Sequence, residues 1–206
     1  VQDHLGLPLD ALLAAAGVVV AAVLSWRAWR VSGAAHPCLL LLSWAAATYA
    51  VSTVNLGFNS LWLDEASTLT FAVKSIPDIW QATTGGEFNP PLFYWIEHLM
   101  LTFGNSEVVL RFIPALLGTL TIPLIYLAGK EFMDRNTGII AAAAFAFSPF
   151  LVFYSQEARA YAVMLFFIAF AMVFYFRALK NGSITDWALF GVLSALAFWT
   201  HFYAMV

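Results

Sequence analysis

The stretch AYAVMLFFIAFAMVFYFRAL at residues 160–179 holds one charged residue, Arg177, and is otherwise almost wholly apolar or aromatic. An α-helix needs about 20 such residues to cross a hydrocarbon core of about 30 Å. Five further apolar runs lie at about residues 9–26, 38–56, 108–127, 137–154 and 187–205. The sequence therefore predicts an all-α polytopic integral membrane protein with about six transmembrane helices.

The composition supports this class and excludes others. Hydrophobic residues make up 62% of the chain and charged residues 10%, with a mean hydropathy of +0.83, whereas about a quarter of the residues in soluble domains are charged. The net charge of −3 and the absence of a basic run argue against a nucleic-acid partner. The single cysteine, Cys38, cannot form an intramolecular disulfide. We interpret residues 1–206 as the N-terminal part of one transmembrane domain.

The basic residues predict an orientation. If the six runs cross the membrane alternately, one side receives six of the nine basic residues and the other side receives Lys74, Arg111 and Arg159. Cytoplasmic loops carry the excess of Lys and Arg, so the first side is predicted to be cytoplasmic. The residues on that side are Arg27, Arg30, Lys130, Arg135, Arg177 and Lys180.

The first outer loop, residues 58–105, contains a further apolar segment at 91–103. As a helix this segment is too short to span, at about 20 Å, and a span would place Glu97 and His98 near the bilayer centre, at a cost of at least about 2.5 kcal/mol. Polar residues recur on one face of it, from Tyr94 to Asn105. We predict an interfacial helix in the outer membrane surface, and another short surface helix within 67–84, interrupted by Pro77.

Two adjacent carboxylates, Asp64 and Glu65, stand at the beginning of this loop. Neighbouring residues of a helix point in different directions, so one carboxylate can meet a substrate while the other holds the loop. Desolvation beside an apolar surface and a nearby like charge both raise a carboxyl pKa, which favours a general base. The alternative is a solvated acidic pair at a helix end.

A second polar group lies in the short outer connection at residues 154–161. Arg159 offers a planar guanidinium fork that matches phosphate oxygens, and Glu157 can orient it or contact sugar hydroxyls. The alternative is a simple Glu157–Arg159 salt bridge between two helices. A divalent cation held by Asp64 and Glu157 is a further option, although no spacing of His, Asp or Glu resembles an established metal site.

Three more residues of the outer side have both a functional and a structural interpretation. Asn89 precedes Pro90 and Pro91, where a helix begins whose free amides can receive an anion; a plain helix start is the alternative. Arg111 can bind an anionic ligand or extend to the membrane interface. His201, among aromatic residues, can bind substrate or serve in packing.

The order of these motifs resembles the GT-C membrane glycosyltransferases, and among them relatives of the protein O-mannosyltransferases (glycosyltransferase family 39) and the aminoarabinose transferases that modify lipid A. The likeness runs from about residue 38 to the chain end, with 9–26 as an additional preceding helix. The motifs are Leu63-Asp64-Glu65, Asn89-Pro90-Pro91-Leu92-Phe93-Tyr94, Arg111-Phe112 and Ser155-Gln156-Glu157-Ala158-Arg159-Ala160-Tyr161.

The resemblance implies a GT-C helical bundle and a hexosyl or pentosyl transferase. It would move a sugar from a polyprenyl- or dolichyl-phosphate carrier to a protein or lipid acceptor at the extracytoplasmic or lumenal face of a prokaryotic cell membrane or the ER membrane. The resemblance assigns the acidic residue near the acceptor to Asp64, with Glu65 adjacent, and a second acidic site to Glu157, where the aminoarabinose transferases have Asp. The substrate-binding candidates are Glu157, Arg111, Arg159, Gln156, Tyr161, Asn89 and His201.

The reaction expected from these residues is an inverting single displacement, with Asp64 taking the proton of the acceptor hydroxyl. Two other classes of protein compete with this interpretation. A membrane transporter places its ionisable residues near the midplane, whereas here they gather at outer helix ends. A non-catalytic polyprenyl-lipid-binding subunit would bind the donor without turnover.

Overall fold

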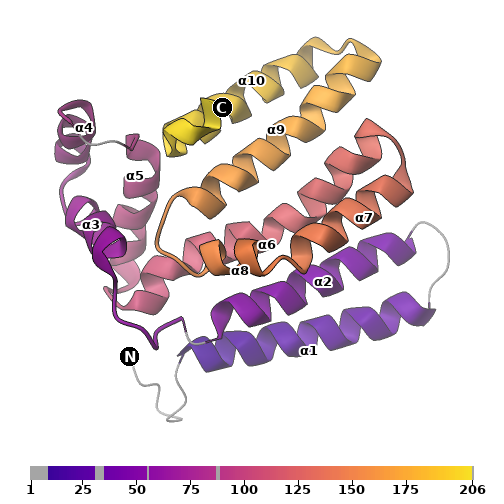
Figure 1. Ribbon diagram of the computed structural model, residues 1–206, viewed down its shortest axis with the longest axis horizontal. Coiled ribbons are helices and arrows are strands. Elements are labelled where there is room, and N and C mark those ends of the chain that lie inside the picture. The colour runs from indigo at the N-terminus through magenta and orange to yellow at the C-terminus, as the bar shows by residue number, and fades with distance from the viewer. Residues whose placement is uncertain (1–8, 31–34, 55, 87–88, 206) are drawn as a thin grey trace.

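The computed structural model describes residues 9–30, 35–54, 56–86 and 89–205, all of whose regular elements are helices (Figure 1). Residues 1–8, 87–88 in the first outer loop, and 206 lie outside the described residues, as does Asn55 within the expected span 38–56. The bundle consists of α1 (Leu9–Arg30), α2 (Ala35–Thr53), α6 (Glu107–Phe132), α7 (Arg135–Ala146), α8 (Pro149–Ser155), α9 (Tyr161–Asn181) and α10 (Ile184–Thr200). The all-α fold predicted from the sequence is confirmed.

Shorter helices gather at one end of the bundle (Figure 1). They are α3 (Leu63–Ala72), α4 (Ile76–Thr84) and α5 (Pro91–Met100), followed by the 3₁₀ turn η1 (Leu101–Phe103); the turn η2 (Phe202–Met205) ends the described chain. The expected surface helix within 67–84 is two helices, because Ser75 caps a new helix with Pro77 in its first turn. We call the end with α3–α5 the loop end and the opposite one the basic end.

Two described helices, α6 and α9, are long and apolar enough by themselves to cross a membrane. The pair α7 and α8 passes the same test together, as a broken span or a re-entrant loop. The remaining apolar segments are shorter, at Ala11–Arg27, Leu40–Thr53 and Ile184–Thr200. Length and composition thus give two or three spans among the described residues, so the expected number of six stays a prediction.

The span predicted at 137–154 corresponds to two helices, α7 and α8, which meet at a bend of 62°. Ser148 is the N-cap of α8 and Pro149 is its first residue. Because proline has no backbone N–H, it cannot donate the hydrogen bond that would continue α7. Thr48 of α2 donates to the carbonyl oxygen of Ala146 at 3.3 Å, and Ser52 and Ser155 share a hydrogen bond of 3.0 Å. Side chains of α2 therefore satisfy polar groups around the break, as an apolar environment demands.

The helix α6 is the centre of the bundle and packs against α2, α7, α8 and α9. Its residues Leu110, Ala115 and Ile122 are fully buried. Where α6 meets α7, Gly129 and Gly138 let the backbones touch: a Cβ atom built on Gly129 would lie 2.8 Å from the Cα of Gly138. Close approach through small residues is a usual way for membrane helices to associate.

The helix α5 begins at the predicted residue, Pro91, and ends at Met100, where the 3₁₀ turn η1 continues to Phe103. Its polar side was expected to face outward from the membrane surface, yet Glu97 is fully buried and Tyr94 nearly so, whereas Leu99 and Phe103 are exposed. His98 contacts the carbonyl oxygen of Ala72 in α3 at 2.8 Å. The polar residues of this helix therefore face neighbouring protein, and its outer face is apolar.

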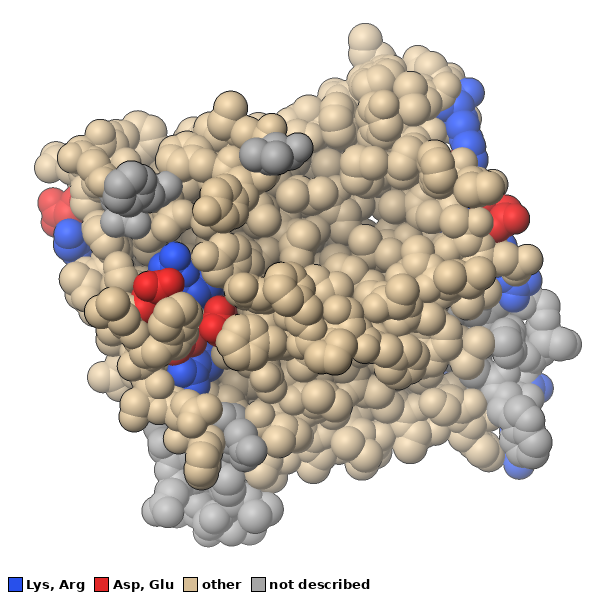
Figure 2. All heavy atoms as spheres, in the orientation of Figure 1, with Lys and Arg blue, Asp and Glu red and all other residues tan. Residues whose placement is uncertain are grey.

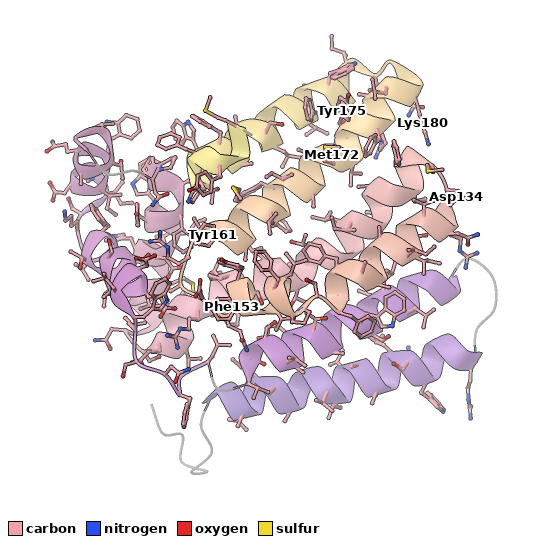
Figure 3. The ribbon with its side chains drawn as sticks, viewed as in Figure 1. Asp134, Phe153, Tyr161, Met172, Tyr175 and Lys180 are labelled. Carbon is pink, nitrogen blue, oxygen red and sulfur yellow. The ribbon has the colours of Figure 1, made fainter. Side chains whose placement is uncertain are left out.

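Charged side chains gather at the two ends of the bundle, and the belt between them is free of charge on the face shown in Figure 2. In Figure 3, Phe153 and Tyr161 lie toward the loop end, whereas Asp134 and Lys180 lie at the basic end. The six basic residues predicted for the cytoplasm all fall in or beside helix termini at the basic end. The basic residues are thus grouped at one end of the bundle, as expected if successive helices cross the membrane in alternating directions.

Candidate functional site

The centre of the loop end is a buried ion pair between Glu65 of α3 and Arg111 of α6. The Nε atom of Arg111 donates to Oε1 of Glu65 at 2.8 Å and its NH2 group donates to Oε2 at 2.6 Å. Only 1% of the Glu65 side chain and 6% of the Arg111 side chain are exposed. This bidentate geometry is the strongest form of the carboxylate–guanidinium contact.

The same pair ties several chain segments together. The NH1 group of Arg111 donates to the carbonyl oxygens of Leu56 and Asn59, the latter at 3.0 Å. Oε1 of Glu65 also accepts from the backbone N–H of Ala158 at 2.8 Å. Burial alone would raise the pKa of Glu65, but the hydrogen bonds from Arg111 and Ala158 outweigh it and the pKa is lowered. Glu65 is therefore held ionised.

Asp64 lies next to Glu65 but in a different environment, with 44% of its side chain exposed. The NH2 group of Arg159 lies 4.0 Å from Oδ2 of Asp64, and NH1 of Arg159 donates to the backbone carbonyl of Asp64 at 3.2 Å. Asp64 thus keeps a solvent-accessible carboxylate beside a guanidinium. Glu65 therefore faces inward and Asp64 faces outward. This agrees with the expectation from sequence that one carboxylate holds the loop while the other can meet a substrate.

Glu157 lies in the turn between α8 and α9 and is 9% exposed. Burial raises the pKa of Glu157, and the nearby negative charge of Glu65 raises it further, while Arg159 acts in the opposite direction. No salt bridge joins Glu157 to Arg159 among the described residues. The simple mutual pairing considered from sequence is therefore wrong, and burial favours the protonated form of Glu157 more than that of an exposed carboxyl group.

A cavity of about 890 Å³ opens beside the ion pair. Its polar wall includes the carboxyl groups of Glu65 and Glu157 and the guanidinium of Arg111, and its apolar wall comes from the end of α2 and from α8. A site of this size and mixed lining suits a ligand with a polar and an apolar part. The lining residues are Val51, Val54, Leu56, Asn59, Ser60, Trp62, Glu65, Arg111, Phe153, Tyr154, Gln156, Glu157 and Tyr161.

The structure brings together part of the set predicted from sequence. Glu65, Arg111, Gln156, Glu157 and Tyr161 line the cavity. Gln156 donates from Nε2 to the carbonyl oxygen of Val51 at 3.2 Å, so this side chain also joins the turn to α2.

The other predicted residues lie outside the cavity lining. Asp64 and Arg159 are next to lining residues in the chain, one residue from Glu65 and two from Glu157. His201 is buried behind Tyr161, with ring centroids 5.2 Å apart, a packing position. Asn89 precedes the cap of α5 and is not among the lining residues.

Three aromatic residues of the cavity, Trp62, Phe153 and Tyr154, were not predicted from sequence. Trp62 precedes the acidic pair and Tyr154 precedes the polar turn, so each adjoins a motif that the sequence did identify. Tyr154 lies edge-on to Tyr161 at 5.2 Å. Their position beside polar motifs at a membrane interface could have identified them. Sequence spacing alone, however, does not distinguish aromatic residues that line a cavity from those that anchor a helix at the interface.

Metal binding stays untested. Within the described part of the chain, no three His, Cys, Asp or Glu side chains lie close enough together to hold an ion. The predicted option of a divalent cation on Asp64 and Glu157 would need ligands from elsewhere, such as substrate phosphate.

The apolar helices agree with a GT-C type membrane glycosyltransferase, the class that a family model supports. The family model described as dolichyl-phosphate-mannose-protein mannosyltransferase matches residues 89–206, and the chain belongs to this family. Family membership and the apolar helices make it an integral membrane protein.

A relative from Aquifex aeolicus (strain VF5), described as an uncharacterized protein, is 28% identical over 131 residues. The match covers 60% of this chain and 26% of the relative, so the chain spans about a quarter of that protein's length. No solved structure matches the chain.

Proposed function

We propose that the protein transfers a sugar from a polyprenyl- or dolichyl-phosphate carrier to a hydroxyl group of a protein or lipid acceptor. The observation that supports this most directly is the carboxylate and arginine cluster beside the cavity, at the end of apolar helices in a member of this family. A carrier lipid keeps its phosphate at the membrane interface, so such an enzyme needs cations, a carboxylate and an apolar wall in one place.

In this proposal Asp64 is the general base. Glu65 is occupied by Arg111 and Ala158, whereas Asp64 keeps an accessible carboxylate. Asp64 takes the proton of the acceptor hydroxyl group. At the same time the oxygen of that hydroxyl group forms a bond to the anomeric carbon of the sugar. The bond between that carbon and the phosphate oxygen breaks at the same time, and the electron pair leaves with the phosphate. One displacement of this kind inverts the anomeric configuration.

The phosphate would leave toward Arg159. Arg111 makes its hydrogen bonds to Glu65 and to two backbone carbonyls, so it serves better to shape the wall. Arg159 is held more loosely, with Asp64 at 4.0 Å. A positive group placed where charge develops lowers the transition-state energy. Glu157, on the cavity wall, would contact sugar hydroxyls.

The site is proposed to face the extracytoplasmic or lumenal side. Six basic residues lie at the basic end, and three lie at the loop end, namely Lys74, Arg111 and Arg159. Two of these three belong to the site itself. The positive-inside rule then assigns the basic end to the cytoplasm.

The test is incubation of the whole protein with labelled polyprenyl-phosphate sugars and acceptor hydroxyls. We expect transfer that falls by about 10²–10⁴-fold in Asp64→Asn, the range for loss of a general base, with donor binding retained. Asp78→Asn, the same change on the exposed start of α4, should leave transfer near the wild-type rate. Donor binding without turnover in the wild type would instead identify a lipid-binding subunit, and near-normal transfer by Asp64→Asn would exclude Asp64 as the base.

A further inference from the structure

We propose that His201 is a positioning residue of the candidate site, a neutral imidazole that supports the ring of Tyr161 and thereby the guanidinium of Arg159. This inference rests on the proposed function, in which Arg159 receives the leaving phosphate. His201 directly follows the last residue of α10 and is 7% exposed. It lies outside the cavity lining, so it would act through its neighbours and not by touching a substrate.

The ring of His201 packs against two tyrosines. Its centroid lies 5.2 Å from that of Tyr161 and 4.6 Å from that of Tyr203, with interplanar angles of 36° and 42°. Tyr161 is the first residue of α9, lies toward the loop end of the bundle (Figure 3) and lines the cavity. Tyr203 belongs to the turn η2. His201 therefore joins the wall of the cavity to the turn that follows α10.

A backbone hydrogen bond fixes the position of the imidazole proton. The N–H group of Tyr203 lies 3.1 Å from Nδ1 of His201. A backbone N–H can only donate, so Nδ1 must accept, and the neutral ring then carries its proton on Nε2. A proton on Nδ1 would set two donors against each other. This contact therefore disfavours the charged form of His201, whatever the effect of burial.

Arg159 meets the same tyrosine ring. Its Cζ atom lies over the ring of Tyr161, 5.8 Å from the centroid, within the range of a cation–π contact. One NH group of Arg159 donates to the backbone carbonyl of Asp64 at 3.2 Å, and 14% of the arginine side chain is exposed. The Tyr161 ring thus limits where the guanidinium can lie, and His201 limits where that ring can lie.

The neutral state of His201 matters because Arg159 lies near it. Burial lowers the pKa of His201, and the positive charge of Arg159 lowers it further. Among the described residues Arg159 is the charged group that acts on this pKa, and the phenol groups of Tyr161 and Tyr203 flank the imidazole. An imidazolium would add a second positive charge that repels the guanidinium. A neutral ring packs on Tyr161 without this repulsion.

Nitrogen NMR of histidine tests the tautomer without relying on turnover. The whole protein, with ¹⁵N-labelled histidine, is placed in phosphatidylcholine nanodiscs at mildly alkaline pH. His98 is the internal control, because its Nδ1 lies 2.8 Å from the carbonyl oxygen of Ala72 and must carry a proton to donate. We expect a bare Nδ1 at His201 and a protonated Nδ1 at His98. His201→Asn or His201→Phe, and His98→Asn, assign the two signals.

Titration of the His201 signal measures the link to the site. In Arg159→Gln the pKa of His201 should rise, because a nearby positive charge is removed. Arg135→Gln is the matched control, the same change at an exposed residue of the basic end, and should leave the pKa of His201 unchanged. A protonated Nδ1 at His201 under the mildly alkaline conditions, or a titration that does not respond to Arg159→Gln, would overturn the inference.

Transfer kinetics distinguish support of Tyr161 from a simple role in the turn. His201→Asn keeps an acceptor for the Tyr203 amide but removes the ring, and should lower kcat by up to about 10²-fold, the cost of misplacing a catalytic group. His201→Phe keeps a neutral ring and removes the acceptor, and should stay closer to the wild type. The reverse order would show that His201 only caps the turn, which contradicts the proposal.

A double-variant cycle shows whether the effect passes through Arg159. In the Arg159→Gln background, His201→Asn should change kcat by no more than about twofold, since the group that it positions is gone. An undiminished loss in that background would also overturn the inference. If the wild type binds donor without transfer, the proposed function fails, while the tautomer and the Arg159-dependent titration still decide the role of His201.

Discussion

The carboxylate of Glu65 and the guanidinium of Arg111, 46 residues apart in the chain, meet through two hydrogen bonds of 2.8 and 2.6 Å in a buried position. This pair fastens the loop after α2, helix α3 and the turn before α9 to helix α6. Asp64 and Glu157 belong to two of these segments. The pair therefore positions the two carboxylates proposed to act on substrate.

Removing one member of this pair is expected to destabilise the protein strongly. Glu65→Gln leaves the Arg111 charge buried without its counterion, which should lower the free energy of unfolding by about 3–5 kcal/mol. Denaturant titration of the protein in detergent micelles measures the loss. The double variant Glu65→Leu/Arg111→Met should recover much of the stability, because no unpaired charge remains. A single variant as stable as the wild type would show that the pair does not hold these segments.

Glu97 gives the protein a pH-dependent stability. Its two carboxyl oxygens have no hydrogen-bond partner among the described residues, and burial raises the pKa of Glu97 well above its ordinary value of 4.5. A group whose pKa is raised on folding contributes its full stability below the unfolded pKa and loses it as the pH rises through the folded value. The wild type should therefore lose stability relative to Glu97→Gln as the pH rises above about 4.5.

Thermal unfolding at a series of pH values measures this difference. Glu107→Gln is the matched control, because that carboxylate is only partly buried at the start of α6, and its profile should follow that of the wild type. Glu97→Leu should be more stable than the wild type at neutral pH. Parallel pH profiles for the wild type and Glu97→Gln would contradict the prediction.

The contact of α6 with α7 should not tolerate a methyl group. A Cβ atom on Gly138 would lie 2.5 Å from the carbonyl oxygen of Tyr126 and 3.0 Å from the nitrogen of Lys130. Gly138→Ala should then cost about 1–3 kcal/mol, because the helices must move apart. At Gly191 in α10 nothing lies within 4 Å of the added atom, so Gly191→Ala should instead gain up to about 1 kcal/mol from helix propensity. Unfolding midpoints of the two variants provide the comparison.

Glycosylation in a eukaryotic microsome tests the orientation. Asn181-Gly182-Ser183 is a natural acceptor sequence at the basic end and should stay unmodified, because that end is assigned to the cytoplasm. Gln81→Asn creates an acceptor sequence with Ala82 and Thr83 on an exposed part of α4 and should be modified. A mobility shift on gels that is removed by endoglycosidase reports each result. Modification of Asn181 would reverse the orientation.

The sequence predicted the helical class and most helix positions because apolar runs have a characteristic length. The run 108–127 lies within α6, and 160–179 matches α9 closely. The run 137–154 was interpreted as one helix, since hydropathy averages over the Ser148-Pro149 step that starts a new helix. Periodicity also identified the polar face of α5, but it could not tell whether that face met water or protein.

The candidate site could be predicted only in part. Sequence motifs pointed to five of the residues that line the cavity, because each stands in a polar segment beside a membrane helix. The pairing of Glu65 with Arg111, rather than Arg111 with a ligand, depends on how α3 packs on α6, and no local pattern encodes that. The residues Val51 and Phe153 line the cavity but are indistinguishable in sequence from other apolar residues of their helices.

The hydrogen bond from the Ala158 amide to Glu65 also concerns the order of assembly. Residue 65 emerges from the ribosome well before residues 111 and 158, so during synthesis its carboxylate first meets α6 and only later the turn before α9. Until that turn arrives, one acceptor of an otherwise buried acid remains open to water. We therefore expect the first outer loop to complete its docking only after residue 158 has been synthesised, so that the site forms late in the assembly of this part of the chain.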